Sequence, residues 1–326
     1  MSRVFISREI PGHAPELLHA AGHDVDIWPE SRPATRAELA AALANADAAL
    51  TMVTDHIDAE LLAASPRLRI IANLAVGYDN VDPAVAAEAG VWLTNTPGVL
   101  AETTADFAFA LLLAAARHVV ASDRDTRAGG WTTWSPTAFL GQDIHGATLG
   151  IVGMGEIGEA MARRAAGFDM RVLYASRTRK PQLESRYGYE WTTLDELLQQ
   201  SDFVSLHTPL TPETRHLIGA RELSLMKPTA ILINTARGQV IDQDALVTAL
   251  RSGRVAGAAV DVTDPEPLPL DSPLYALSNV IITPHIASAS LATRSRMAEM
   301  AVANILAVLA GKEPPNAVNR PQHPRR

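Results

Sequence analysis

The fold is decided by the stretch TLGIVGMGEIGEAMARRAAGF, residues 148–168. Its first five residues form an apolar run that leads directly into Gly153-x-Gly155-x-x-Gly158, and an alanine-rich helical pattern follows. A strand, a glycine turn and a helix in this order are typical of nucleotide-binding βαβ units, because the glycines let the backbone approach a pyrophosphate at the helix N-terminus. A second strand pattern at 171–174 completes the unit. The stretch therefore predicts a nucleotide-binding α/β domain.

Outward from this stretch, short apolar runs alternate with alanine-rich segments along the whole chain. This alternation is typical of α/β folds with parallel sheets. Strands are predicted at 4–7, 24–28, 48–53, 70–73 and 91–94 before the stretch, and at 203–206, 231–234, 257–262 and 280–283 after it. Helices are predicted at 14–21, 36–45, about 101–121 and about 291–310, followed by a Pro-rich polar tail.

Composition restricts the classes of function. The chain has 326 residues, 47% of them hydrophobic, enough for two domains with substantial cores. Its net charge of −8 argues against general affinity for nucleic acid, because no basic surplus is present to replace phosphate counterions. No cysteine is present, which excludes disulfides and thiolate chemistry, and we find no convincing set of metal ligands among the ten histidines, so no metal site is expected.

No segment of the sequence predicts membrane insertion. The longest apolar run, 107–116, is far shorter than the ~20 residues that a membrane helix needs. The N-terminus has too short an apolar run for a signal peptide. We therefore expect a cytoplasmic protein with no membrane partner.

The segment after the second strand of the βαβ unit, SRTRK at 176–180, carries cations where many nucleotide sites carry an acid. An Asp or Glu near this place binds the ribose hydroxyls of NAD. A serine does not repel the 2′-phosphate of NADP, to which Ser176 and Thr178 can donate, and Arg177 can clamp it while Arg179 adds positive potential. This pattern predicts a preference for NADPH over NADH. The alternative is a solvated run of cations without cofactor discrimination.

Three later segments each place polar residues at the end of a predicted strand. They carry Arg237 in ILINTARG, Asp261 and Glu266 in AAVDVTDPEP, and His285 in VIITPHIAS. In open α/β sheets, ligands bind at the carboxyl ends of the strands, so we expect these side chains to converge near the nicotinamide end of the pocket. Each residue alone has a structural interpretation: Arg237 could cap a turn, Glu266 could be a solvated charge, and His285 could be a packed histidine. Their combination favours catalysis.

With these motifs in place, the chain resembles the D-2-hydroxyacid dehydrogenases, most closely the glyoxylate/hydroxypyruvate reductases. The resemblance covers nearly the whole chain in order, through NLAVGYDNVD at 73–82, LAETTADFAFALLLAAAR at 100–117, GWTTWSP at 130–136, GMGEIG at 153–158, INTARG at 233–238, VDVTDPEPLP at 260–269 and TPHIAS at 283–288. It implies a Rossmann cofactor domain at 99–286 and a flavodoxin-like, discontinuous substrate domain at 1–98 and 287–326.

The resemblance implies a role for each candidate residue. His285 would protonate the keto oxygen, as suits a side chain whose ordinary pKa lies near neutrality. Glu266 would orient the imidazole, and Arg237 would grip the substrate carboxylate through its fork of donors. Further substrate contacts would come from Leu74 and the backbone N–H groups of Val76 and Gly77.

The resemblance also implies cofactor contacts along the whole pocket. Asp261 would bind the nicotinamide amide. Other contacts would come from Thr104, Gly153, Gly155, Glu156, Ile157, Gly158, Ser176, Arg177, Thr178, His207, Thr208, Pro209, Thr214, Thr235, Ala236, His285 and Ala287. Many relatives carry glycine where this chain has Ala287, so the backbone there would approach the cofactor slightly less closely.

The tryptophan-containing loop GWTTWSP implies a homodimer through the cofactor domain. In the reductases that the chain resembles, this loop reaches across the dimer, and Trp134 matches the residue that closes the partner's substrate pocket. The alternative is that Trp131 and Trp134 only fill an interface. The predicted reaction reduces glyoxylate or hydroxypyruvate to glycolate or D-glycerate with NAD(P)H. A formate- or phosphite-type dehydrogenase and a nucleotide-sensing corepressor remain as alternatives on the same scaffold.

Overall fold

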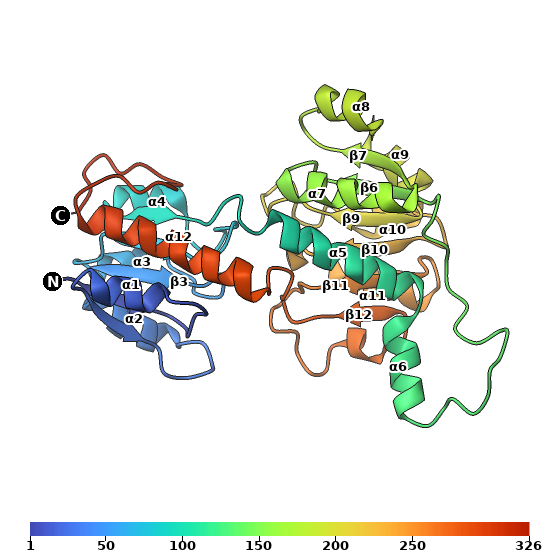
Figure 1. The fold of residues 1–326 in the computed structure, drawn as a ribbon, viewed down its shortest axis with the longest axis horizontal. Coiled ribbons are helices and arrows are strands. Elements are labelled where there is room, and N and C mark those ends of the chain that lie inside the picture. The colour runs from blue at the N-terminus through green and yellow to red at the C-terminus, as the bar shows by residue number, and fades with distance from the viewer. Residues whose placement is uncertain (326) are drawn as a thin grey trace. The chain divides into compact units, whose positions relative to one another are not determined.

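The structure, a computed structural model that describes residues 1–325, divides into two compact units. The first unit comprises Met1–Leu100 and the residues from Ala289 onward, and the second comprises Ala101–Ser288. The domain limits expected from the sequence, 98/99 and 286/287, each lie two residues before these limits. Figure 1 shows the elements of both units.

The first unit is built on a five-stranded sheet in the order β2-β1-β3-β4-β5, with all strands parallel. Its strands are β1 (Arg3–Ile6), β2 (Asp24–Ile27), β3 (Ala48–Thr51), β4 (Ile70–Asn73) and β5 (Trp92–Thr94). The central strand β3 and its neighbour β4 are buried at every residue. Strands covered on both faces read as continuous apolar runs, which is why the sequence predicted them.

Helices cover both faces of this sheet. One face packs against α1 (Ala14–Ala20) and α12 (Leu291–Leu309), and the other against α2 (Arg36–Ala44), α3 (Ala59–Ala63) and α4 (Pro83–Glu88). The helix that returns from the end of the chain, α12, supplies five core residues to its face: Ala298, Ala301, Val302, Ile305 and Val308. The first unit is therefore complete only with this distant segment.

The polar tail after α12 packs along the edge of the first sheet. Ala317 forms an antiparallel bridge with Thr94 of β5, and the N–H of Val318 donates to the carbonyl of Leu93 at 2.8 Å. Asn319 is 8% exposed; its side chain accepts from the N–H of Leu93 at 2.8 Å and donates to the carbonyl of Val91 at 3.0 Å. The tail thus satisfies backbone groups that an open sheet edge would leave unpaired.

The second unit is built on a seven-stranded parallel sheet in the order β12-β11-β10-β9-β6-β7-β8. Its strands are β6 (Thr148–Val152), β7 (Arg171–Ala175), β8 (Glu190–Trp191), β9 (Phe203–Leu206), β10 (Ile231–Asn234), β11 (Gly257–Val260) and β12 (Val280–Ile282). The predicted α/β fold with two parallel sheets is confirmed. The strand order reverses between β6 and β9, and ligands bind at such a switch point.

Two layers of helices enclose the second sheet. One face packs against α5 (Ala101–Ala116) and α7 (Glu156–Ala165), and the other against α9 (Leu194–Gln200), α10 (Ala220–Leu225) and α11 (Gln243–Arg251). The remaining helices are α6 (Val119–Arg127) and α8 (Pro181–Tyr187), with short 3-10 turns at Ala166–Phe168, Gly238–Val240 and Pro273–Ala276.

The prediction of one long helix over about 101–121 is wrong. The segment forms two helices, α5 and α6, whose axes are bent by 62°. His118, between them, has a left-handed backbone with φ 53°. This conformation is uncommon for a residue other than glycine and ends a right-handed helix. No glycine or proline at this place announced the break.

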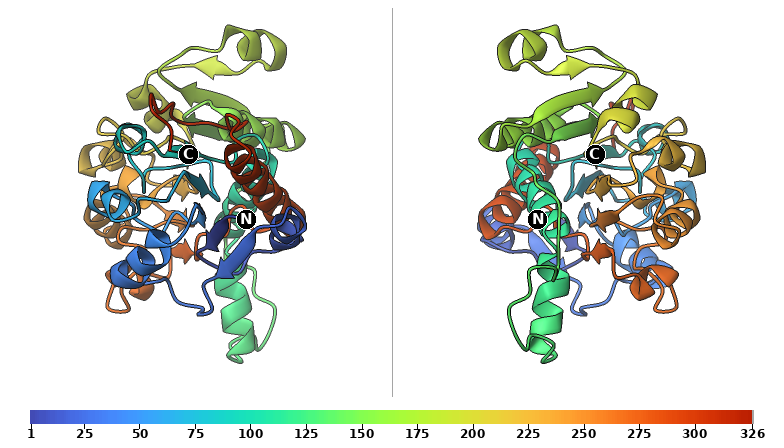
Figure 2. Two further views of the ribbon diagram at one scale, coloured as in Figure 1. Left: turned by 90° about the vertical axis from the view of Figure 1, so that its left-hand side faces the viewer. Right: turned by 90° about the vertical axis from the view of Figure 1, so that its right-hand side faces the viewer.

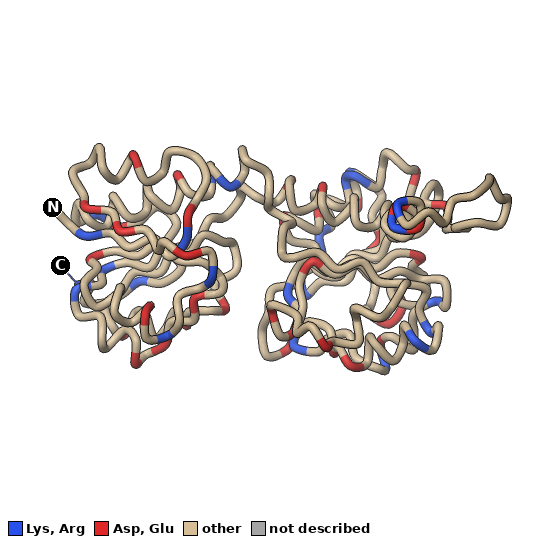
Figure 3. The backbone as a smooth tube through the Cα atoms, turned by 90° about the horizontal axis from the view of Figure 1, so that it is seen from below, with Lys and Arg blue, Asp and Glu red and all other residues tan. Residues whose placement is uncertain are grey.

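Beyond the break, α6 and the loop that follows it extend away from the sheet of their unit (Figure 2). Among residues 1–325 no single helix is long and apolar enough to cross a membrane; α5 and α6 meet that test only together, as a bent pair, by length and composition alone. In both units, basic and acidic residues are interspersed along the chain (Figure 3).

The contacts of Asn319 predict a specific loss of stability. In Asn319→Leu the N–H of Leu93 and the carbonyl of Val91 lose their partner while the leucine still fills the space. Each buried backbone group left unpaired costs ~1–3 kcal/mol, so we expect the free energy of unfolding to fall by ~2 kcal/mol or more in urea titrations. Arg320→Ala, an exposed neighbour, is the matched control and should unfold like the wild type. Equal stability of the two variants would contradict the role of the tail.

Candidate active site

The glycine loop joins β6 to α7 as the sequence predicted. Gly153 has φ 97°, and Gly155 is the N-cap of α7, with open space where its side chain would be. A Cβ on Gly158 would lie 2.1 Å from the carbonyl oxygen of Gly153, so only glycine allows the helix to begin this close to the strand. The loop therefore leaves the first N–H groups of α7, from Glu156, Ile157 and Gly158, facing open space.

Two buried hydroxyls near this loop fit a bound dinucleotide. Thr208 follows β9 and Thr235 follows β10, and the Oγ1 atom of each is buried without a hydrogen-bond partner. Buried polar atoms are normally paired, so unpaired ones at the carboxyl ends of neighbouring strands indicate a place where a polar ligand binds. With the helix N-terminus of α7, these hydroxyls form the donor set that a pyrophosphate and ribose would use.

His207, at the end of β9, is neutral at neutral pH. Its burial lowers the pKa of the imidazole to about 4, and its Nε2 lies 2.9 Å from the hydroxyl of Ser205. The carbonyl of His207 is the atom that a Cβ on Gly153 would meet, at 2.7 Å. His207 therefore shapes the glycine loop without adding a positive charge to it.

The segment at the end of β7 is held by a network that the sequence did not predict. The buried hydroxyl of Tyr174 donates to Glu184 at 2.6 Å and accepts from the N–H of Lys180 at 2.7 Å. Glu184 also binds the guanidinium of Arg179 through three contacts of 2.6 to 3.1 Å, and this pairing holds the pKa of Glu184 at about 2. Trp191, on β8, lies 5.8 Å from that guanidinium.

These contacts correct one part of the NADP hypothesis. The charge of Arg179 is neutralised by Glu184, so Arg179 does not supply the free positive potential that we expected of it. Arg177 is exposed, and among residues 1–325 it forms no hydrogen bond or ion pair. The hydroxyl of Ser176 already donates to the carbonyl of Thr178 at 2.7 Å, so it must rotate to donate to a phosphate.

The imidazole of His285 and the carboxylate of Glu266 lie in direct contact. Nδ1 of His285 is 2.6 Å from Oε1 of Glu266, and both side chains are about one-third exposed. A carboxylate accepts hydrogen bonds, so Nδ1 donates and Nε2 is the ring nitrogen left to act on a ligand. The pair connects the loop after β11 to the turn after β12.

Asp261 fixes the turn that carries His285. The carboxylate of Asp261 is 1% exposed and accepts from the hydroxyl of Thr283 at 2.6 Å and from the N–H groups of Ile286 at 2.9 Å and Ala287 at 2.8 Å. The N–H of His285 donates to the carbonyl of Asp261 at 2.9 Å, and His285 itself has φ 55°. Asp261 thus holds this turn with three of the about four lone-pair positions of its carboxylate, and its contact with the nicotinamide amide stays a prediction.

Arg237 lies in the turn after β10, beside the loop that carries Glu266. Its Nη1 donates to the carbonyl of Ala236 at 2.8 Å, and its own carbonyl accepts from the amide of Asn234 at 2.8 Å. The next residue, Gly238, approaches the neighbouring loop so closely that a Cβ would lie 2.0 Å from the carbonyl of Thr263. The structure therefore brings the segments of Arg237, Glu266 and His285 together at one edge of the second sheet.

The remaining predicted residues are placed as follows. Leu74, Val76 and Gly77 lie in the loop after β4 of the first unit. In the second unit, Thr104 is buried in α5, and Pro209 lies on the loop after β9, where Thr214 donates to its carbonyl at 2.6 Å.

The two tryptophans of the loop after α6 are exposed, Trp134 at 79% and Trp131 at 71%. Among residues 1–325, no group of three or more His, Asp or Glu side chains could hold a metal ion.

Known proteins match both the sequence and the structure. A family model described as D-isomer specific 2-hydroxyacid dehydrogenase, NAD binding domain, matches residues 109–287. A glyoxylate reductase of Korarchaeum cryptofilum is 52% identical over 320 residues, which cover 98% of this chain and 96% of that protein. The matched family model is that of a domain that binds a nicotinamide cofactor, in agreement with the glycine loop.

Solved structures share the fold over the full length. The TT0316 protein from Thermus thermophilus is similar with a TM-score of 0.92 and 51% identity, covering 97% of this chain and 99% of that chain. An NADPH-dependent glyoxylate/hydroxypyruvate reductase from Sinorhizobium meliloti, in complex with NADP and malonate, is similar with a TM-score of 0.82 and 32% identity, covering 100% of this chain and 98% of that chain. The expected resemblance is confirmed, and the chain belongs to the D-isomer specific 2-hydroxyacid dehydrogenases.

Proposed function

We propose that this protein reduces short 2-keto acids, with glyoxylate and hydroxypyruvate as leading substrates, to glycolate and D-glycerate. The observation that carries the proposal is the 2.6 Å contact between His285 and Glu266 beside the turn of Arg237. The names of similar proteins, glyoxylate reductase and glyoxylate/hydroxypyruvate reductase, support the same substrates. Formate, phosphite and peptide ligands have no comparable support.

The chemistry needs a hydride on the keto carbon and a proton on the keto oxygen. A bound reduced nicotinamide supplies the hydride. His285 supplies the proton from Nε2, while Glu266 keeps Nδ1 engaged and so holds the ring in one orientation. Arg237 grips the carboxylate and polarises the adjacent carbonyl, because a guanidinium presents two parallel donors to a carboxylate. The test is the fall in reduced-nicotinamide absorbance when the purified protein meets glyoxylate or hydroxypyruvate.

We propose that the cofactor is preferentially NADP(H), with NAD(H) as a weaker alternative. Arg177 supports this because its guanidinium is exposed and donates no hydrogen bond within residues 1–325, although Glu213 lies close enough for the charge of Arg177 to lower the pKa of Glu213. Because Arg179 is paired with Glu184, we assign the contacts with the 2′-phosphate to Ser176, Arg177 and Thr178 alone. The 2′-phosphate would therefore meet the guanidinium of Arg177 and the hydroxyls of Ser176 and Thr178, once the Ser176 hydroxyl rotates away from the carbonyl of Thr178.

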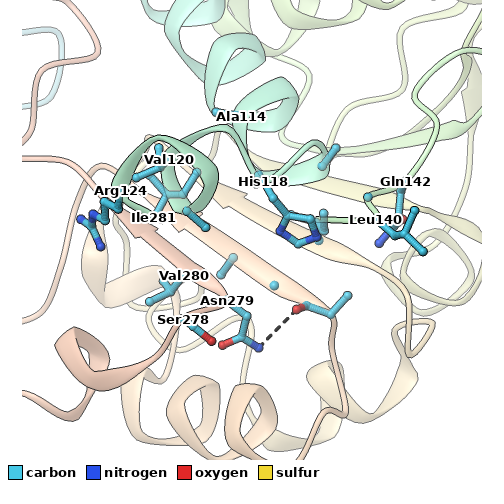
Figure 4. A pocket seen from close by; sticks show the side chains of 18 residues that line it. Ala114, His118, Val120, Arg124, Leu140, Gln142, Ser278, Asn279, Val280 and Ile281 are labelled. Carbon is cyan, nitrogen blue, oxygen red and sulfur yellow. Dashed lines mark hydrogen bonds between the residues drawn. The ribbon is translucent and has the colours of Figure 1, made fainter. Parts of the chain in front are cut away.

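We also propose a homodimer through the cofactor domain. Large apolar side chains are exposed together on α6 and its loop: Val119, Trp131, Trp134, Phe139 and Leu140. Beside them lies a pocket of about 320 Å³, shown in Figure 4, at the amino ends of β10, β11 and β12. The side chains of His118 and Asn279 both line this pocket (Figure 4). A second copy of the chain would remove this apolar surface from water.

His285→Ala tests the proton donor. We expect turnover of hydroxypyruvate to fall ~10²–10⁴-fold because proton transfer is lost, while cofactor affinity, measured by fluorescence titration, stays as in the wild type. His145→Ala, an exposed histidine paired with Asp169, is the matched control and should be fully active. Near-normal turnover of His285→Ala would assign the proton to another group.

Arg177→Ala tests the cofactor preference. A charge-assisted hydrogen bond to a phosphate is worth ~1.5–3 kcal/mol, so the Kd of NADPH should rise roughly ten- to a hundredfold while that of NADH hardly changes. Arg186→Ala removes a nearby exposed cation on α8 that lies over Tyr187, and should leave both constants unchanged. If wild-type protein binds NADH as tightly as NADPH, the 176–180 segment is not a phosphate site.

Trp134→Ala tests the role of the exposed loop. If Trp134 closes the pocket of a partner subunit, its removal should alter the ranking of hydroxypyruvate against bulkier keto acids and leave the Kd of the cofactor unchanged. Analytical ultracentrifugation of the wild type should give a dimer. Leu17→Ala, an exposed apolar residue of the first unit, is the control. An unchanged substrate ranking would reduce Trp134 to a packing residue.

A further inference from the structure

The loop after β4, residues 74–78, presents three successive backbone donors without partners. The N–H groups of Val76, Gly77 and Tyr78 form no hydrogen bond with any group among residues 1–325. Val76 and Gly77 are half-buried, and Tyr78 is exposed. A run of free N–H groups in one loop is a common way for a protein to bind an anion without using a side-chain charge.

The carbonyl groups of the same peptides are all held by the chain. The carbonyl of Ala75 accepts from the N–H of Thr96 at 2.8 Å. That of Val76 accepts from the side-chain amide of Asn95 at 2.8 Å, and that of Gly77 accepts from the side-chain amide of Asn73 at 2.9 Å. Thr96 and Asn95 follow β5 and Asn73 ends β4, so two neighbouring strands carry these three donors.

Peptide geometry connects the two observations. In a trans peptide the C=O and the following N–H lie in one plane and point in opposite directions. The peptides 75–76, 76–77 and 77–78 are trans, since the cis bonds in the described chain are Asp264–Pro265 and Glu266–Pro267. Holding the three carbonyls on the side of the sheet therefore directs the three N–H groups away from it, toward the side where they have no partner.

We propose that Asn95 and Asn73 are positioning residues that hold the loop 74–78 as a three-donor site for the carboxylate of the 2-keto acid, with Tyr78 supplying the third N–H. The proposal rests on the proposed function, which it deepens by naming the groups that aim the carboxylate donors. Neither asparagine touches the substrate. Each acts through the peptide whose carbonyl it holds.

The surroundings of the two asparagines give them different roles. Asn73 is fully buried and lies in an amide network with Asn80, whose own amide donates to the carbonyl of Asp55 at 2.9 Å. Asn95 is half-buried, and within the described residues its side chain makes a single hydrogen bond, to the carbonyl of Val76. Asn95 can therefore be replaced with little loss of packing, and its effect on the loop can be measured separately from folding.

Loss of the Asn95 amide should weaken substrate binding rather than slow the chemical step. Without that donor the carbonyl of Val76 has no internal partner and turns toward water, which takes the N–H of Gly77 out of line. The carboxylate does not change its charge during reduction, so its contacts are equal in the ground and transition states and their loss appears in KM. Loss of one hydrogen bond to the carboxylate should lower the affinity for the substrate about tenfold.

The experiment compares Asn95→Ala with Asn45→Ala, an exposed asparagine of the same unit whose amide also donates to a backbone carbonyl, that of Ala41. In Asn95→Ala we expect KM for hydroxypyruvate and the inhibition constant of oxamate, an unreactive keto-acid analogue, to rise about tenfold together. The turnover number should stay within about twofold and the Kd of the cofactor should not change. Asn45→Ala should match the wild type in all four constants.

The outcomes separate this proposal from the proposed function. If the wild type reduces keto acids and Arg237→Lys impairs it, but Asn95→Ala keeps wild-type KM and oxamate affinity, only the positioning role is overturned. If the wild type reduces no 2-keto acid, the proposed function fails. If the alanine variant does not fold, Asn95→Asp, which keeps the side-chain shape but loses the donor, replaces it in the test. KM should rise in this variant also at ~1 M salt, where repulsion between the new carboxylate and the substrate is screened. A rise that salt abolishes would overturn the proposal.

Discussion

The buried carboxylate of Asp261 is the constraint on which the candidate active site depends. This carboxylate accepts hydrogen bonds from the hydroxyl of Thr283 and from the N–H groups of Ile286 and Ala287, all in the turn after β12. The backbone carbonyl of Asp261 accepts a fourth, from the N–H of His285. A turn held at four points has little freedom, and this is why His285 keeps a left-handed backbone that a histidine adopts only at a cost. The direction of the imidazole toward Glu266 follows from that anchor.

The sequence predicted the strands and the site segments well for a common reason. Parallel strands buried on both faces read as nearly continuous apolar runs, and β4, β6, β9 and β10 were predicted at their observed limits. The ends of strands in one parallel sheet lie at one edge, so the convergence of Arg237, Glu266 and His285 followed from the order of elements. The specific pattern at 153–158 located the cofactor loop in the same way.

What the sequence could not predict lies in side-chain partnerships and backbone exceptions. The break at His118 needs a left-handed residue, and histidine gives no such signal in a sequence. The pairing of Arg179 with Glu184 joins residues of a loop and a helix that nothing in the sequence distinguishes from solvated charges. The amides of Asn73 and Asn95 matter through the carbonyls that they hold, and only coordinates show which carbonyls those are.

The return of α12 to the first sheet has a consequence for the order in which the protein is made. A ribosome synthesises the first hundred residues well before α12, so one face of the five-stranded sheet has only α1 as cover while the whole second unit is being translated. The nascent chain must carry exposed apolar strands throughout that interval, which is the condition under which aggregation competes with folding. The second unit is continuous and can fold as it emerges, whereas the first becomes complete only after residue 309.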